Sequence, residues 1–101
     1  MYPSEHKMRP FRLSDLPTYQ GWFSDPDTQR WVSQPDDRWW VHVSAGGRST
    51  CRASEDSRVL CGVLQVDWEK KGYAFVCVVV DPAKRGRGLG TRLLRSFLAH
   101  H

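Results

Sequence analysis

The chain has 101 residues, of which 40% are hydrophobic and 26% charged, and its formal net charge is +4. This length allows one domain and excludes two, and the composition is that of an ordinary globular protein. No apolar run is long enough to span a membrane and the N-terminus lacks the apolar core of a signal peptide, so we expect a cytoplasmic protein without membrane contact.

The first part of the chain predicts an edge strand followed by a helix. Residues 6–12 form the strand, and Pro10 in its middle places it at the edge of a sheet. The helix starts at Ser14, which can act as its cap, and ends near Ser24. Its inward face carries apolar side chains at helical spacing, namely Leu16, Tyr19, Trp22 and Phe23.

Two more helices are predicted before the strands resume. One starts with Asp25 as its cap and ends near residues 34–35. The other starts at residues 36–37 and stops at the glycine pair 46–47. Because Trp39 and Trp40 are adjacent, this helix cannot turn both inward, and one of them is expected to line a substrate cleft. Trp22 and Trp31 are expected to pack in the core.

Three strands follow, joined by short turns. Residues 49–53 form a weak polar strand, and residues 55–57 form a turn. Residues 58–66 form a stronger strand, which ends in a turn over residues 67–72. The hydrophobic run of residues 73–81 is almost unbroken, which predicts a strand buried on both faces.

A final helix begins at Gly86 or Gly88, after Pro82 has ended the last strand. One stripe of this helix is apolar and consists of Leu89, Leu93, Leu94, Phe97 and Leu98. The order is therefore strand, helices, three-stranded meander and helix. Short turns make the meander antiparallel, so we expect an α+β fold with a mostly antiparallel sheet.

The turn before the final helix has the character of an anion site. Gly86, Gly88 and Gly90 let an anion approach the unpaired N–H groups of a helix start. Basic side chains surround the turn and do not form a continuous tail: Lys84, Arg85, Arg87, Arg92 and Arg95. This arrangement favours a phosphate ligand over a nucleic acid. Nucleic-acid binding is kept as an alternative function that only the net charge supports. The spacing G-x-G-x-G differs from the dinucleotide fingerprint and from the P-loop.

The cysteine pattern predicts neither a disulfide bond nor a metal site. Cys51, Cys61 and Cys77 are odd in number, and no close Cys or His spacing of a zinc site is present. We expect them to be reduced and packed on strands, with no bound metal.

The segment from Val80 to Leu94 resembles the signature of the GCN5-related N-acetyltransferases (GNAT). Their motif [QR]-x-x-G-x-[GA] is met by Arg85, Gly88 and Gly90, and the flanking Val-x-Pro and Leu-Leu also match. Residues 8–17 and 22–31 resemble the opening of members that acetylate ribosomal proteins and aminoglycosides. The resemblance implies one truncated GNAT-like domain over residues 1–101, with an incomplete form of that fold.

The resemblance also implies a cofactor and a reaction. Acetyl-CoA would be the co-substrate, and its acetyl group would pass to an amine of a small molecule or a peptide. The strand before the turn would pair with the pantetheine arm and the turn would hold the pyrophosphate. The residues so assigned are Val78, Val79, Val80, Arg85, Gly86, Arg87, Gly88, Leu89, Gly90, Thr91 and Arg92.

The catalytic residues stay unassigned. Family members continue with further strands and a helix that commonly carries a thiolate-protonating tyrosine, and the position of their glutamate base aligns near Phe75. Asp67, Glu69 and Tyr73 lie near a strand start and are candidates to reach an amine, although such residues are often only a polar turn. The histidines are expected at the surface: His6, His42, His100 and His101.

If the 101 residues are the whole molecule, one edge of the strand between Tyr73 and Asp81 is unpaired, which favours a homodimer or higher oligomer through that edge. A fragment of a longer enzyme is an equal alternative. The alternative function to an N-acetyltransferase is a catalytically inactive CoA-binding half-domain that acts through oligomerisation.

Overall fold

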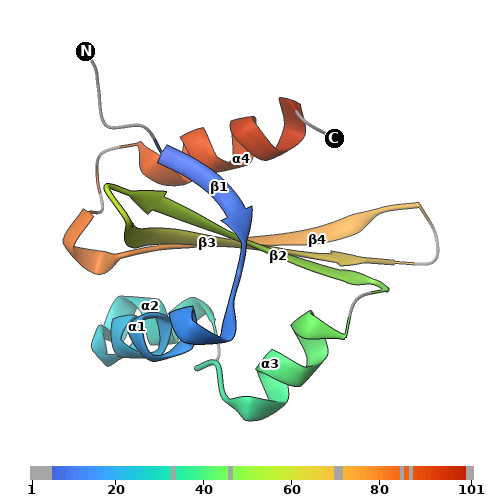
Figure 1. The fold of residues 1–101 in the computed structure, drawn as a ribbon, viewed down its shortest axis with the longest axis horizontal. Helices are drawn as coiled ribbons and strands as arrows, with labels where there is room; N and C mark the ends of the chain where they lie inside the picture. Colours follow the sequence, from blue (N-terminus) through green and yellow to red (C-terminus); the bar gives the residue numbers. More distant parts are fainter. Residues whose placement is uncertain are drawn as a thin grey trace.

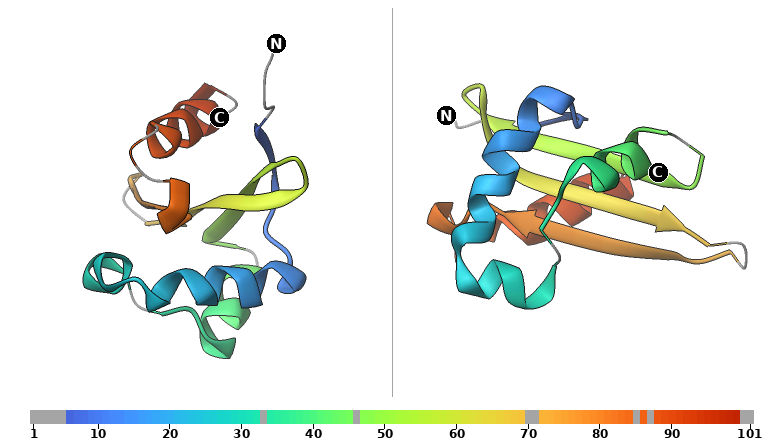
Figure 2. Two further views of the ribbon diagram at one scale, coloured as in Figure 1. Left: turned by 90° about the vertical axis from the view of Figure 1, so that its left-hand side faces the viewer. Right: turned by 90° about the horizontal axis from the view of Figure 1, so that it is seen from below.

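The structure, a computed structural model, describes residues 6–32, 34–45, 47–69, 72–84, 86 and 88–99. Within these residues one antiparallel sheet has four strands in chain order: β1 His6–Pro10, β2 Ser49–Asp56, β3 Val59–Trp68 and β4 Ala74–Val80. Helix α4, Leu89–Ala99, covers one face (Figure 1). The other face carries α1 Leu16–Gly21, α2 Pro26–Trp31 and α3 Asp37–Ser44 (Figure 2). The predicted α+β fold is confirmed.

The first strand lies at an edge, as Pro10 predicts. Within the described residues β1 pairs with β2 alone, and Pro10, which has no N–H to donate, is its last residue. Arg9 ties β1 to its surroundings, because its guanidinium donates to Glu55 Oε2 at 2.8 Å and to Asp15 Oδ2 at 2.7 Å.

The helix predicted from Ser14 is built differently from its prediction. A 3-10 turn over Leu13–Asp15 precedes α1, and Ser14 is exposed and does not act as the cap. Asp15 closes this turn instead, since its Oδ2 accepts the N–H of Arg12 at 2.8 Å. A second 3-10 turn, Trp22–Ser24, completes the segment, so its predicted end near Ser24 is confirmed.

Asp25 caps α2 as predicted, and Asp36, one of the two residues predicted to begin the next helix, is the cap of α3. Asp25 Oδ2 accepts the N–H of Thr28 at 3.0 Å, and Asp36 Oδ1 accepts the N–H of Trp39 at 2.9 Å. Helix α2 ends at Trp31, earlier than predicted, because Val32 takes an extended conformation. Gly46, half of the predicted stop of α3, lies outside the described residues.

The turns of the meander lie elsewhere than predicted. Glu55 and Asp56 belong to β2, and the turn consists of Ser57 and Arg58, whose φ angles are 51° and 69°. Positive φ at both central residues is the geometry of a tight two-residue hairpin. Asp67 belongs to β3, where it pairs with Ser49 and with Phe75, and is not part of a turn. Cross-strand pairing thus extends both strands beyond their hydrophobic residues.

The prediction that the last strand is buried on both faces is wrong. Phe75 is 62% exposed and Val76 is 45% exposed, whereas Val79 is 5% exposed. In the second half of β4, Val78 and Val80 pack against α4 and Val79 packs against the other helical layer, while in the first half only Ala74 packs against the cluster that contains Phe97. Within the described residues β4 has a paired neighbour on one side only. Its hydrophobic first half is therefore an exposed sheet edge.

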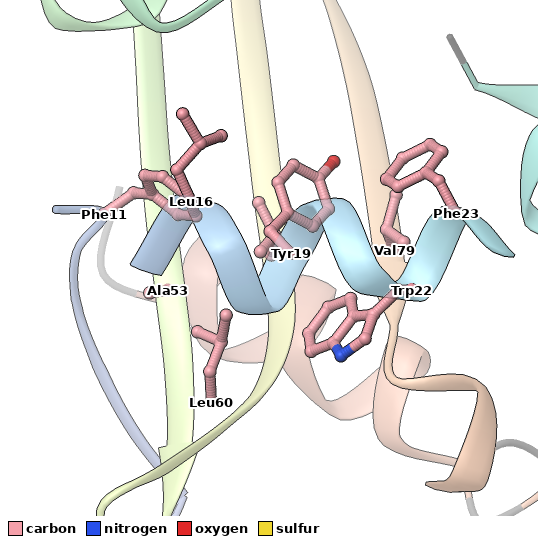
Figure 3. Packing of buried hydrophobic residues seen from close by; sticks show 9 residues of the cluster. Phe11, Leu16, Tyr19, Trp22, Phe23, Ala53, Leu60 and Val79 are labelled. Carbon is pink, nitrogen blue, oxygen red and sulfur yellow. The ribbon is translucent and has the colours of Figure 1, made fainter. Parts of the chain in front are cut away.

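The main core lies between the sheet and the three N-terminal helices. Figure 3 shows the side chains of Tyr19, Trp22 and Phe23 beside Val79 and the neighbouring strands. Trp39 and Trp40 both pack against this cluster, and both rings lie against Phe11, so the prediction that one turns away is wrong. Burial raises the pKa of Tyr19. The side chain of Trp31 lies outside the described part of the chain.

Helix α4 packs through most of its predicted stripe. Leu89, Leu93 and Phe97 are buried and Leu94 is half-buried, but Leu98 is 62% exposed and does not belong to the stripe. Leu98 directly follows Phe97, and one residue corresponds to a rotation of about 100° around the helix axis, away from the face that contacts the sheet. Gly62 of β3 lies under Leu93, where a Cβ would collide with Leu93 Cδ1.

Candidate functional site

The connection from β4 to α4 is held by a short network around Asp81. Its N–H donates to the carbonyl of Cys61 at 2.9 Å, which continues the sheet by one bond. Its Oδ1 accepts the N–H of Ala83 at 3.0 Å, and its carbonyl accepts the N–H of Lys84 at 2.8 Å. These bonds fold Pro82–Lys84 into a 3-10 turn. The chain is thereby directed away from the strand and toward the start of α4.

The backbone conformation at two positions of the following turn favours glycine. Gly86 has φ of 79° and Gly88 has φ of 71°, values in the left-handed region that side chains disfavour. No heavy atom lies within 4 Å of a Cβ placed at either position, so the turn is open to its surroundings. Arg85 and Arg87, both assigned to the pyrophosphate, lie outside the described residues.

Helix α4 begins directly after Gly88. The N–H of Arg92 donates to the carbonyl of Gly88 at 3.1 Å, which is the first bond of the helical pattern. The N–H groups of the preceding residues at a helix start have no partner of this kind and carry partial positive charge. Leu89 is buried and anchors this end on Cys61. A fixed helix start behind an open glycine turn is suited to bind an anion.

A pocket of about 550 Å³ lies beside the second half of β4. Its walls include all three valines assigned to the pantetheine arm, Val78, Val79 and Val80, and residues of α2 on the opposite side. Those residues are Asp27, Thr28 and Arg30. The volume lies in the range of ligand pockets. The sequence did not point to the α2 residues, since only the fold brings α2 and the end of β4 to the same pocket.

A second pocket, of about 350 Å³, lies at the other end of β4. Asp67, Glu69 and Phe75 line it, and α3 and β2 add His42 and Ser49. The sequence analysis had named Asp67 and Glu69 but not Ser49, which carries no motif. His42 is exposed as predicted. Tyr73 stacks edge-on against Phe75, with ring centroids 5.9 Å apart. The side chain of His6, and all of His100 and His101, lie outside the described part of the chain.

The three cysteines are free thiols, as predicted. Burial raises the pKa of Cys51 to about 12, and it also raises the pKa of Cys61 and Cys77. Thiols held protonated in this way are poor nucleophiles. No helix among the described residues has the length and apolarity to cross a bilayer.

Comparisons with known proteins agree on the fold. The chain is similar to a putative phosphinothricin N-acetyltransferase, with a TM-score of 0.70 and 20% identity over 94% of this chain and 63% of that one. It is also similar to a GNAT family acetyltransferase from Brucella melitensis in complex with acetyl-CoA, with a TM-score of 0.69 and 19% identity over 97% of this chain and 69% of that one. A third structure is AAC(6')-Iy with a CoA-based bisubstrate analog, at a TM-score of 0.63 and 17% identity, covering 92% and 69%.

The chain thus spans less than two thirds of the first of these structures. A comparison with curated protein sequences finds no match. The model of the acetyltransferase (GNAT) family matches residues 6–101, which is almost the whole chain. The glycine turn, the helix start behind it and the sheet order all lie within that match. The chain therefore belongs to the acetyltransferase (GNAT) family.

Proposed function

We propose that the protein is an N-acetyltransferase that moves an acetyl group from acetyl-CoA to an amine of a small molecule or a peptide. One observation carries this proposal: the left-handed glycines Gly86 and Gly88 join the pocket-lining end of β4 to the start of α4. The edge of β4, the open glycine turn and the start of α4 follow one another along the chain. This order is suited to a ligand that has an extended arm and a pyrophosphate.

In this proposal the cofactor follows the chain. The backbone of Val78, Val79 and Val80 pairs with the pantetheine arm, and the turn with the first helical residues holds the pyrophosphate. The second group consists of Arg85, Gly86, Arg87, Gly88, Leu89, Gly90, Thr91 and Arg92. At Gly90 a Cβ would lie 3.7 Å from Val80 Cγ2, which is an ordinary van der Waals contact, so its assignment rests on the motif and not on space.

Two measurements test the proposal. Calorimetry with acetyl-CoA reports cofactor binding, and thiol release from acetyl-CoA reports transfer to n-butylamine, spermidine, kanamycin or an alanyl peptide. We expect saturable binding and turnover with at least one amine. Absence of binding at millimolar cofactor contradicts the proposal.

A second candidate function is a CoA-binding half-domain, of residues 1–101 as one domain, that lacks catalysis and acts by association. It is favoured by the exposed hydrophobic start of β4, where Phe75 is 62% exposed on an edge without a described neighbour, and by Tyr73 just before the strand, which is 53% exposed. Such an edge pairs readily with a second copy of itself. Binding of acetyl-CoA without turnover of any amine, together with dimers in sedimentation, would support this alternative.

The free cysteines support a reducing compartment, and we place the protein in the cytoplasm. Partition of a tagged full-length chain between cell fractions tests this placement.

A further inference from the structure

The pocket at the start of β4 contains a hydrogen-bonded group of three side chains from three elements. His42 comes from α3, Ser49 from β2 and Asp67 from β3. Ser49 Oγ lies 2.6 Å from Asp67 Oδ1 and 2.9 Å from His42 Nε2, and His42 Nε2 lies 3.3 Å from Asp67 Oδ1. All three line the same pocket. We refer to them below as the His42 cluster.

The distances determine the direction of these hydrogen bonds. An ionised carboxylate only accepts, so Ser49 donates its single hydroxyl proton to Asp67. Ser49 Oγ must then accept from His42, which places a proton on Nε2 of the ring. In the neutral imidazole the lone pair therefore lies on Nδ1. Ser49 is not arranged as a nucleophile, because its proton points to a carboxylate and not to the imidazole.

A chain of hydrogen bonds connects the His42 cluster to the core. Asp67 Oδ2 accepts from Gln65 Nε2 at 3.1 Å, and Gln65 Oε1 accepts from Trp39 Nε1 at 2.9 Å. Trp39 packs against the main hydrophobic cluster. The carboxylate that orients Ser49 and His42 is thus itself oriented by a packed side chain. Such support is what holds a proton-transferring group in one geometry.

The pocket lies on the path that the acetyl group would take. A cofactor arm that starts at the turn after Val80 and runs along β4 past Val78 is directed toward Phe75. Asp67 is the cross-strand partner of Phe75, and Leu64 is the partner of Val78. Three residues along a strand correspond to about 10 Å. Paired residues lie on the same sheet face, so Asp67 and Phe75 share the face of Val79, which also lines the larger pocket.

From this geometry we infer that His42 is the general base of the proposed acetyl transfer, with Ser49 and Asp67 as positioning residues for its ring. The inference rests on the proposed function. His42 Nδ1 takes one proton from the ammonium form of the acceptor. The amine nitrogen then forms a bond to the acetyl carbonyl carbon, the C–S bond breaks with its electron pair left on sulfur, and the second nitrogen proton passes to the thiolate. The products are the acetamide, the CoA thiol and a protonated His42.

Charged groups around the ring come from several elements. Asp67 on β3, Glu69 after it and Arg48 line the same pocket as the ring. Arg38 lies one helical turn before His42 on α3. The carboxylate nearest the ring, that of Asp67, also fixes its tautomer.

The test uses the full chain with acetyl-CoA and whichever amine of the four is turned over. We expect His42→Gln to lower kcat by about 10²- to 10⁴-fold. Its acetyl-CoA affinity should stay within twofold of the wild type, and the acid limb of the pH–rate profile should vanish. Val41→Gln, an exposed change on the same helix, should leave kcat and the profile unchanged. Circular dichroism confirms that each variant is folded.

Nitrogen NMR of the imidazole provides a readout that needs no acceptor. We expect the neutral His42 ring to be protonated at Nε2, and Ser49→Ala and Asp67→Asn to mix in the Nδ1-protonated form and shift the acid limb. A neutral ring protonated at Nδ1 in the wild type overturns the inference, as does a His42→Gln variant with unchanged kcat and pH profile. In either case the transferase proposal stands if the wild type turns over an amine. Absence of turnover with all four amines contradicts both the N-acetyltransferase proposal and the role of His42 as general base.

Discussion

Replacing Gly88 with different side chains distinguishes the effect of backbone strain on stability from the effect of charge on acetyl-CoA binding. Because φ is 71° and no heavy atom lies within 4 Å of a new Cβ, a side chain there is strained but does not collide with a neighbour. Gly88→Ala should therefore cost about 1–2 kcal/mol of stability. For a domain of this size each kcal/mol lowers Tm by about 4–8 °C. Asn and Asp tolerate this backbone region better, so Gly88→Asn and Gly88→Asp should be closer to the wild type in stability.

The Asn and Asp variants have the same shape and differ in charge. A carboxylate about 5–6 Å from a phosphate, at an effective dielectric constant of about 30, is repelled by about 2 kcal/mol. Gly88→Asp should then bind acetyl-CoA about 30-fold more weakly than Gly88→Asn in calorimetry. The difference should shrink at high salt, since exposed charges are screened. Equal affinities for the two variants, or a difference that salt does not change, would refute the assignment of the pyrophosphate to this turn.

Three further predictions concern stability and association. Burial acts to raise the pKa of Asp15, but hydrogen bonds from Arg9 and from the N–H of Arg12 outweigh it and lower the pKa. The stabilisation is therefore complete above the ordinary carboxyl pKa and is lost as the pH falls through the lowered one. Urea titrations should show Asp15→Asn destabilised at pH 7 and nearly equal to the wild type at about pH 2; a constant difference would contradict this. Gly62→Ala should cost about 1–3 kcal/mol through overpacking, and should cost less in a Leu93→Ala background, as a double-mutant cycle would reveal. Phe75→Lys should shift any dimer toward monomer in sedimentation velocity, and an unchanged distribution would exclude the β4 edge as the interface.

The elements could be predicted from the sequence wherever a local cause determines them. Asp25 could be identified as a cap because the cap bond spans only three residues, and Asp36 makes the same bond at one of the two predicted starts of α3. The edge position of β1 follows from the missing N–H of Pro10. The ends of the strands were predicted less accurately. Glu55 and Asp67 are polar and belong to strands because they pair with a neighbouring strand, and such pairing leaves no pattern in the local sequence.

Burial was the property that local patterns predicted least well. The run ending at Val80 is hydrophobic throughout, yet Phe75 and Val76 within it are exposed, and which residues the helices cover depends on how all the elements pack together. Trp39 and Trp40 both reach the core because both rings pack against Phe11, a contact between residues far apart in the sequence.

The candidate site divides in the same way. Gly86 and Gly88 were recognised by type and spacing, and their positive φ angles explain why glycine stands there. The His42 cluster joins three elements, so neither the spacing of its members nor their types predicted it.

The placement of β1 has a consequence for how the chain folds. The connections from β2 to β3 and from β3 to β4 are short in sequence, whereas β1 meets β2 only after the three N-terminal helices, and Arg9 and Glu55 are 46 positions apart. Closure of a loop of that length costs about 3 kcal/mol in chain entropy before any contact is gained. We therefore expect the meander to form first and β1 to dock late. In the native protein, amide exchange should accordingly begin at β1, with the Arg9 ion pairs as the last contacts to form and the first to open.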